Sequence, residues 1–138
     1  MRFIDANVFI YAILKPKSSL PAAVQKKKSA AKNIFLRVNE GEPVITTTVH
    51  LSEVANVLED TAGLEFVIDL LTAIFSKPTI EVEPVTPDIY LESALTAKKS
   101  GISVNDALAL LVMEKRGIEE IYTFDRHFGQ VNVKVVQE

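Results

Sequence analysis

Short apolar runs alternate with longer stretches of helical periodicity along most of this chain. The strand-like runs occupy residues 2–5, 43–46, 80–85, 120–124 and 132–136. The helical patterns, in which apolar positions recur every three or four residues, occupy residues 6–14, 22–40, 48–60, 64–76, 87–100 and 104–116. A loop is expected between Pro16 and Pro21. This alternation predicts an α/β fold with a parallel sheet and helices on both of its faces.

The composition narrows the class of protein. The chain has 138 residues, of which 48% are hydrophobic and 24% are charged, and we expect a single domain over residues 1–138. It contains no cysteine, so disulfides and thiolate metal sites are excluded. No apolar run approaches the roughly 20 residues that cross a bilayer, and the first residues do not resemble a secretion signal. We therefore expect a cytoplasmic protein without a membrane partner.

Four acidic residues stand against apolar neighbours, where a carboxylate is not needed for solubility. Asp5 ends the first strand-like run, and Asp125 ends the fourth. Glu53 lies within the apolar stretch of residues 49–58, and Asp106 immediately precedes the apolar residues of the last helix. A buried carboxylate costs free energy unless hydrogen bonds or a cation stabilise it. Because hard divalent cations prefer carboxylate oxygens, the pattern predicts a metal site.

A parallel sheet would bring some of these acids close together. The C-terminal ends of parallel strands share one edge of the sheet, and ligands bind along that edge. Asp5 and Asp125 both fall at strand ends, so they lie near each other if the first and fourth strands are neighbours. Asn7 and Thr123 stand two residues from these acids and are expected to support them.

Each acid also has a structural explanation. Asp5 fits the N-cap of the helix that follows it, and Asp125 fits the cap of a short turn. Ser103 and Asp106 have the spacing of a capping box, and a carboxylate is favoured in the first turn of a helix. Glu53 is the hardest to explain in this way, because its neighbours on the helix are apolar. For Asp106, capping and metal binding are compatible with each other, whereas for Asp5 they stand as alternatives.

Several further features receive structural interpretations. Asn56 lies three residues after Glu53 and is expected to orient its carboxylate. His127 is interpreted as a surface residue, and the run Lys26–Lys28 as a solvated helix face, with RNA contact as the alternative. The apolar helix at residues 64–76 is interpreted as a core element, with a dimer or partner interface as the alternative.

Taken together, these motifs resemble those of the PIN-domain ribonucleases, and in particular the VapC-type toxins of VapBC toxin–antitoxin systems. The matching segments are Phe3-Ile4-Asp5-Ala6-Asn7, Ser52-Glu53-Val54, Ser103-Val104-Asn105-Asp106-Ala107-Leu108 and Thr123-Phe124-Asp125. The resemblance covers nearly the whole chain. It implies a PIN-like α/β/α sandwich with a central parallel five-stranded sheet, in which the first and fourth strands are adjacent.

The resemblance also implies a metal-dependent endoribonuclease that hydrolyses RNA phosphodiester bonds. The residues that would bind Mg²⁺ or Mn²⁺ and carry catalysis are Asp5, Glu53, Asp106 and Asp125, with Asn7 and Thr123 in support. A small antitoxin protein and a second copy of the chain, as a homodimer, are the implied partners.

The nuclease hypothesis has alternatives. A housekeeping RNA-processing nuclease of the same fold would use the same acids. A haloacid-dehalogenase-like phosphatase also begins with an aspartate after the first strand, but it needs an acid at position 7, where this chain has Asn7. A non-enzymatic RNA-binding domain would not need buried acids. In the nuclease hypothesis Asp5 and Asp106 hold the main cation, while Glu53 and Asp125 complete its shell, position the attacking water or hold a second ion.

Overall fold

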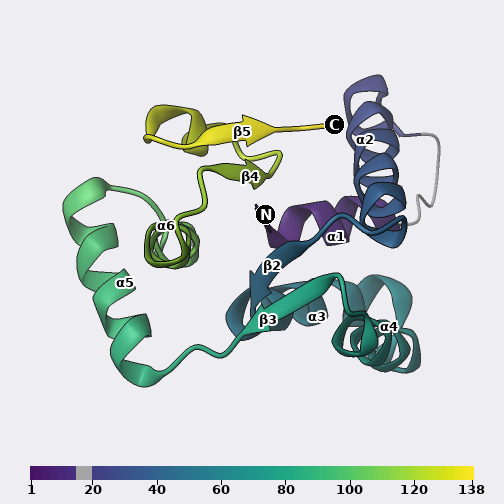
Figure 1. Ribbon diagram of the computed structural model, residues 1–138. Coiled ribbons are helices and arrows are strands. Elements are labelled where there is room, and N and C mark those ends of the chain that lie inside the picture. The colour runs from purple at the N-terminus through teal and green to yellow at the C-terminus, as the bar shows by residue number, and fades with distance from the viewer. Residues whose placement is uncertain (15–19) are drawn as a thin grey trace.

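A sheet of five parallel strands lies at the centre of the molecule (Figure 1). The computed structural model describes residues 1–14 and 20–138, so the loop expected between Pro16 and Pro21 lies largely outside the described residues. The strands are β1 (Arg2–Ile4), β2 (Val44–Thr47), β3 (Ile80–Glu83), β4 (Glu120–Tyr122) and β5 (Lys134–Val136). Their spatial order is β3-β2-β1-β4-β5, which confirms the predicted α/β fold with adjacent first and fourth strands.

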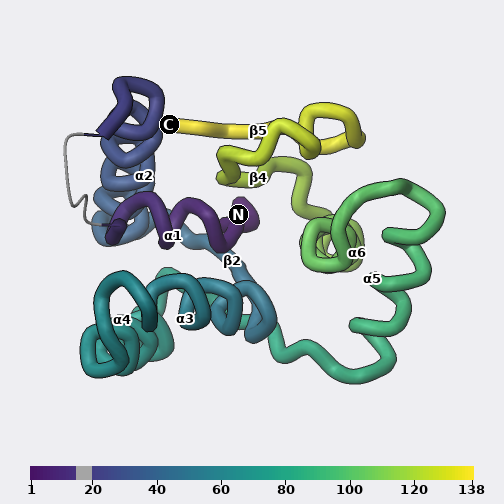
Figure 2. The backbone as a smooth tube through the Cα atoms, turned by 180° about the vertical axis from the view of Figure 1, so that it is seen from behind, coloured from purple at the N-terminus to yellow at the C-terminus, as the bar shows by residue number. Residues whose placement is uncertain are grey.

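Helices cover both faces of this sheet, as the sequence pattern predicts. They are α1 (Ala6–Ile13), α2 (Ala22–Asn39), α3 (Thr48–Ala62), α4 (Leu64–Ser76), α5 (Pro87–Ser100), α6 (Val104–Arg116) and the 3₁₀ helix η1 (Arg126–Gln130). Figures 1 and 2 show α1 to α4 on one side of the sheet and α5 and α6 on the other. Across the part of the chain that the structure describes, no helix is both long and apolar enough to cross a membrane.

Two buried clusters fix the strands between these layers. Successive residues of a strand point to opposite faces of a sheet. Phe3 and Ile121 therefore pack on the α6 side with Leu108, whereas Ile4 and Tyr122 pack on the side of α1 to α4. All of these side chains are fully buried. The paired strands β1 and β4 are thus held from both sides, which sets the position of the residues that follow them.

The predicted and observed elements differ mainly at the ends of the strands. Helices α4, α5 and α6 begin and end as predicted, because Gly101 and Gly117 end two of them in the left-handed conformation. Strand β1 ends at Ile4 and β4 ends at Tyr122, although the apolar runs continue to residues 5 and 124. Of the residues directly after these strands, Asp5 and Thr123 belong to the candidate site described below, whereas Phe124 packs in the core.

The interpretation of the lysine run as a solvated helix face is wrong for two of its three residues. Lys26 is exposed, but the ammonium group of Lys27 lies 5.4 Å from the centre of the Tyr11 ring. The Lys28 ammonium group donates hydrogen bonds to the backbone oxygens of Ala12 at 3.2 Å and Leu14 at 2.6 Å. Helix α1 has no basic residue in its own last turn, so α2 supplies the cation that its terminal carbonyl groups favour.

The interpretation of residues 64–76 as a core element is only partly correct. In α4, Val67 and Ile74 are buried against the rest of the domain. An adjacent side of the helix leaves large apolar side chains in solvent, with exposed fractions of 62% for Leu64, 53% for Ile68 and 59% for Phe75. An exposed apolar helix face of this kind favours the alternative interpretation, contact with another protein.

Replacing Lys28 tests the contact between α2 and α1. Lys28→Met removes two charge-assisted hydrogen bonds to the end of α1, so we expect the free energy of unfolding to fall by about 1–2 kcal/mol. Urea denaturation followed by circular dichroism measures this change. Lys26→Met is the matched control, because it removes the same charge from an exposed position of the same helix. Equal destabilisation by the two substitutions would contradict the structural role of Lys28.

Candidate active site

Asp5 is the most buried of the four acids, with 5% of its surface exposed. Its backbone N–H donates to the carbonyl oxygen of Tyr122 at 3.0 Å, which continues the pairing of β1 with β4 by one residue. Its Oδ1 accepts a hydrogen bond from the backbone N–H of Ala6 at 2.8 Å, so the residue does cap α1. Its Oδ2 accepts a hydrogen bond from the Thr123 hydroxyl at 2.7 Å. Capping therefore accounts for one carboxylate oxygen, and the other faces the residues after β4.

The hydroxyl of Thr123 joins the two strand ends. It donates to Asp5 and accepts hydrogen bonds from the Asn7 amide at 3.2 Å and from the backbone N–H of Asp125 at 3.0 Å. The amide oxygen of Asn7 in turn accepts from the backbone N–H of Phe124 at 3.3 Å. A threonine hydroxyl offers one donor and two acceptor sites, and all three are used here. The structure thus places Asn7 and Thr123 beside the acids that they were expected to support.

Glu53 approaches the same edge from α3, and its partner comes from a different helix than expected. The amide nitrogen of Asn105, in α6, donates to Glu53 Oε1 at 2.8 Å. The Tyr90 hydroxyl, in α5, donates to the amide oxygen of Asn105 at 2.9 Å. Asn56, which the sequence favoured for this role, is exposed on α3. The expectation for Asn56 is therefore wrong, because spacing along one helix carries no information about which side chain a second helix brings.

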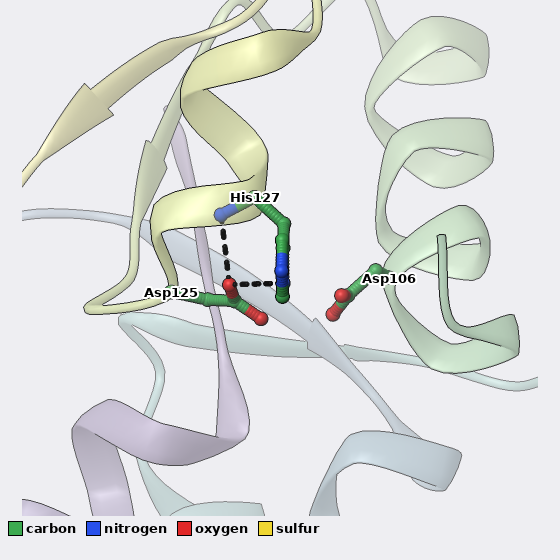
Figure 3. A group of neighbouring side chains, drawn as sticks. All are labelled: Asp106, Asp125 and His127. Atoms are coloured by element: carbon green, nitrogen blue, oxygen red, sulfur yellow. Dashed lines mark hydrogen bonds and ion pairs between the residues drawn. The ribbon is translucent and has the colours of Figure 1, made fainter. Parts of the chain in front are cut away.

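Asp106 and Asp125 face each other across the gap between α6 and the start of η1, as Figure 3 shows. One ligand atom from each of these acids and one from His127 lie within 4.8 Å of one another. Asp125 Oδ1 accepts a hydrogen bond from the backbone N–H of His127 at 2.9 Å and lies 2.9 Å from its Nδ1 (Figure 3). His127 is exposed, as expected, but its imidazole belongs to the acidic cluster, which the sequence interpretation missed.

Helix capping holds these two aspartates in place. The Ser103 hydroxyl accepts a hydrogen bond from the backbone N–H of Asp106 at 3.1 Å, as the predicted capping box requires of its serine. Asp125 is the N-cap of η1, as its position before a short turn indicated. In both cases the cap fixes the backbone at the carboxylate, so capping and a role in the site coexist.

Burial and the negative charges of nearby acids raise the pKa of Asp5 and of Asp106. Burial raises the pKa of Asp5 to about 7, and the negative charges of Asp106 and Glu53 act in the same direction against the hydrogen bond from Thr123. Burial also raises the pKa of Asp106, and the charges of Asp125 and Glu53 again add to the effect. Asp5, Glu53 and Asp106 are therefore close enough for their charges to interact, as are Asp106 and Asp125.

The donor set fits a hard divalent cation. The four carboxylates provide oxygen ligands, which Mg²⁺ and Mn²⁺ prefer, and the His127 imidazole is a further ligand that suits Mn²⁺ better than Mg²⁺. The groups that hold Asp5 and Glu53 are neutral: a backbone N–H, a hydroxyl and an amide. Neutral donors fix the carboxylates without cancelling their charge, so the site can attract a cation.

A model of the PIN domain family matches residues 2–134. The chain belongs to the PIN domain family. Proteins of this family are nucleases, and membership supports an enzymatic role for the edge of the sheet that holds the acids.

Solved structures with the same fold include toxins. The fold resembles that of VapC20 from Mycobacterium tuberculosis, a sarcin–ricin loop cleaving toxin, with a TM-score of 0.78, 20% identity and full coverage of both chains. VapBC2 from Rickettsia felis, bound to a DNA fragment from their promoter, has a TM-score of 0.64 and 16% identity over 98% of this chain and 96% of that chain. FitAcB from Neisseria gonorrhoeae has a TM-score of 0.61 with the same identity and coverage. No curated protein matches the sequence.

The raised pKa of Asp5 predicts that the metal-free protein loses stability as the pH rises. A carboxyl group whose pKa is higher in the folded chain keeps its proton longer there than in the unfolded chain. The free energy of unfolding should therefore fall between about pH 4 and the folded pKa of about 7, by on the order of 2–4 kcal/mol for Asp5. Denaturation in EDTA at pH 5 and pH 8 measures this difference.

Asp5→Asn is the control for this pH dependence, because asparagine caps a helix equally well and does not ionise. We expect the substituted chain to lose less stability between pH 5 and pH 8 than the original chain, and to be the more stable of the two at pH 8. Equal losses in the two proteins would show that the Asp5 carboxylate is not destabilised by its surroundings.

Proposed function

We propose that this chain is a cytoplasmic, metal-dependent endoribonuclease, and that it is the toxin of a toxin–antitoxin pair. The observation that carries the proposal is the cluster of Asp106, Asp125 and His127 within 4.8 Å at the edge of a PIN fold, beside the buried Asp5. An acidic site of this kind suits phosphodiester hydrolysis, in which an anionic group must be neutralised and water activated.

Mg²⁺ or Mn²⁺ is the proposed cofactor, held by Asp5, Glu53, Asp106 and Asp125. When bound, such a cation lowers the pKa of water and stabilises the negative charge that develops on the phosphate. The side chains of the protein set the geometry. Thr123 holds the Asp5 carboxylate, and the backbone N–H of His127 holds that of Asp125. Each acid can thus keep its direction before a cation arrives, which lowers the reorganisation needed for catalysis.

RNA is the proposed substrate. Among the structures with this fold, VapC20 is a sarcin–ricin loop cleaving toxin, which supports an RNA substrate for this chain as well. Arg126 and His127 are exposed directly after Asp125, so their side chains are available to a phosphate beside the acids. Arginine pairs well with phosphate oxygens and fixes the position of a backbone without reading its sequence.

The alternative of a haloacid-dehalogenase-like phosphatase is poorly supported. That mechanism needs a proton donor at position 7, whereas both ends of the Asn7 amide are engaged, with the Thr123 hydroxyl and the backbone N–H of Phe124. Asn7 therefore has a structural use in ordering the chain after β4. A housekeeping nuclease would share the same acids and differs from a toxin in its partners.

An antitoxin and a second copy of the chain are the proposed protein partners. Two exposed apolar surfaces support them: one on α4, with Leu64, Ile68 and Phe75, and one on α5, with Leu91 and Leu95. A separate hollow of about 360 Å³ between α1, α2 and α4 is lined mainly by apolar side chains, among them Leu70 and Ile74. The R. felis relative of the same fold is the complex VapBC2, which supports an antitoxin here.

Metal binding should be visible as thermal stabilisation. We expect Mn²⁺ or Mg²⁺ at about a hundredfold excess over its dissociation constant to raise Tm by roughly 5–15 °C, because the cation removes the repulsion among the carboxylates. Differential scanning fluorimetry with NaCl at matched ionic strength isolates the specific effect. Asp5→Asn should lose most of the shift, and a shift that persists in that variant would place the cation elsewhere.

RNA cleavage is the direct test of the proposed activity. Purified protein should cleave one or more species of a total RNA sample that contains ribosomal and transfer RNA, in Mg²⁺ or Mn²⁺ but not in EDTA. Asp5→Asn should lower the rate by about a hundredfold or more, as expected when an electrostatic contact to the transition state is lost. Gel electrophoresis with primer extension locates the cut sites.

Asp60→Asn is the matched control for this assay, because it changes the same functional group at an exposed position of α3. It should cleave like the original chain. Cleavage that survives both EDTA and Asp5→Asn would come from a contaminating nuclease. Failure to cleave any of these RNAs, together with failure to bind either metal, would overturn the proposed function.

A further inference from the structure

Three side chains from three helices form a hydrogen-bonded series that ends on the Glu53 carboxylate. The Tyr90 hydroxyl of α5 donates to Asn105 Oδ1 at 2.9 Å. Asn105 Nδ2, in α6, donates to Glu53 Oε1 in α3 at 2.8 Å. Because an ionised carboxylate only accepts hydrogen bonds, the amide NH₂ group of Asn105 faces Glu53, and its amide oxygen is left to the Tyr90 hydroxyl. Tyr90 therefore holds the far end of the amide that meets Glu53.

The position of Asn105 in the chain ties this series to the acids. Asn105 immediately precedes Asp106 in the first turn of α6, where Ser103 caps the helix. The same turn thus presents one carboxylate of the site and the group that orients a second carboxylate from another helix. The charge of Glu53 in turn raises the proton affinity of both Asp5 and Asp106.

A purely structural role is the competing explanation, in which the series only ties α3 to α6 and α5. Helices α5 and α6 already contact each other, and Leu108, Val112 and Met113 of α6 lie in the buried core. Tyr90 is 39% exposed, and Asn105 and Glu53 are only partly buried. Hydrogen bonds in partly solvated positions contribute little to stability. These hydrogen bonds would therefore add little to the stability of the fold. They would still restrict the orientation of the Glu53 carboxylate.

We propose that Asn105 and Tyr90 are positioning residues, which hold the Glu53 carboxylate toward Asp5 and Asp106 for cation binding. The inference rests on the proposed metal-dependent function and deepens it. Without the amide donor, Glu53 is free to adopt other rotamers among its apolar neighbours, and a cation must then order it on binding. The cation should consequently bind more weakly even though every carboxylate remains present.

The test measures Mn²⁺ affinity by electron paramagnetic resonance, and RNA cleavage in parallel. Asn105→Ala should weaken Mn²⁺ binding about tenfold or more, the usual effect of losing an orienting partner of a ligand. Tyr90→Phe keeps the ring and should weaken binding about fivefold, as expected for one hydrogen bond. Asn56→Ala, at an exposed position of α3 three residues from Glu53, is the matched control and should leave the affinity unchanged. All three variants should keep Tm in EDTA within a few degrees of the original chain.

Double substitutions separate positioning from structure. In a Glu53→Gln background, Asn105→Ala should have little further effect on Mn²⁺ affinity, because the residue acts through the missing carboxylate. Tyr90→Phe should likewise add little to Asn105→Ala. Full additivity in either pair would overturn the proposal, as would unchanged affinity in Asn105→Ala. If Asn105→Ala does not fold, the surface variant Tyr90→Phe carries the same test.

The outcomes distinguish this inference from the proposed function on which it rests. An original chain that neither binds Mn²⁺ nor cleaves RNA would overturn both together. An original chain that binds and cleaves, with the same affinity in Asn105→Ala as in Asn56→Ala, would overturn only the positioning role.

Discussion

The parallel pairing of β1 with β4 is the constraint on which the rest of the site depends. Its last hydrogen bond runs from the backbone N–H of Asp5 to the carbonyl oxygen of Tyr122, at 3.0 Å. Asp5 and Thr123 are the first residues after β1 and β4. The Thr123 hydroxyl donates a hydrogen bond to the Asp5 carboxylate at 2.7 Å, across a sequence separation of 118 residues. Because buried side chains hold the two strands from both faces of the sheet, this meeting is fixed by the core rather than by a flexible loop.

The means by which the carboxylates are held explain how they can remain close together. Backbone N–H groups, the Thr123 hydroxyl and the Asn105 amide donate to Asp5, Glu53 and Asp125. A lysine or arginine in these places would stabilise each acid more strongly, but it would also neutralise the charge. Neutral donors leave the negative potential in place, and this potential adds to the effect of burial, which is the main reason for the raised pKa of Asp5. The close acids therefore make the folded protein less stable, and the proposed cation would offset this cost.

The sequence was sufficient for the elements and for the acids at the ends of strands, because both leave local signals. Periodicity and cap residues such as Gly101, Ser103 and Gly117 define the bounds of α5 and α6. The orienting role of Asn105 was not predictable in this way, since it depends on the approach of α6 to α3. Asn56 was the wrong choice for the same reason, because a helical pattern reports only neighbours on its own helix. The contact of Lys28 with the end of α1 was likewise not predictable, because it depends on the packing of α2 against α1 and the neighbouring lysines suggested a solvated surface.

Helix geometry offers a reason why this edge of the sheet can tolerate so many acids. Asp5 is the N-cap of α1, Asp125 is the N-cap of η1, and Asp106 lies in the first turn of α6. The backbone dipoles at the N-terminal end of an α-helix favour negative charge, by typically 0.3–1 kcal/mol for a surface residue. Glu53 lies deeper in α3, beyond the first turn, where this effect has largely fallen away. It is also the acid that accepts a hydrogen bond from a side chain of another helix. This indicates that the Asn105 amide stabilises the negative charge of Glu53, as the helix N-termini stabilise the charges of the other three acids.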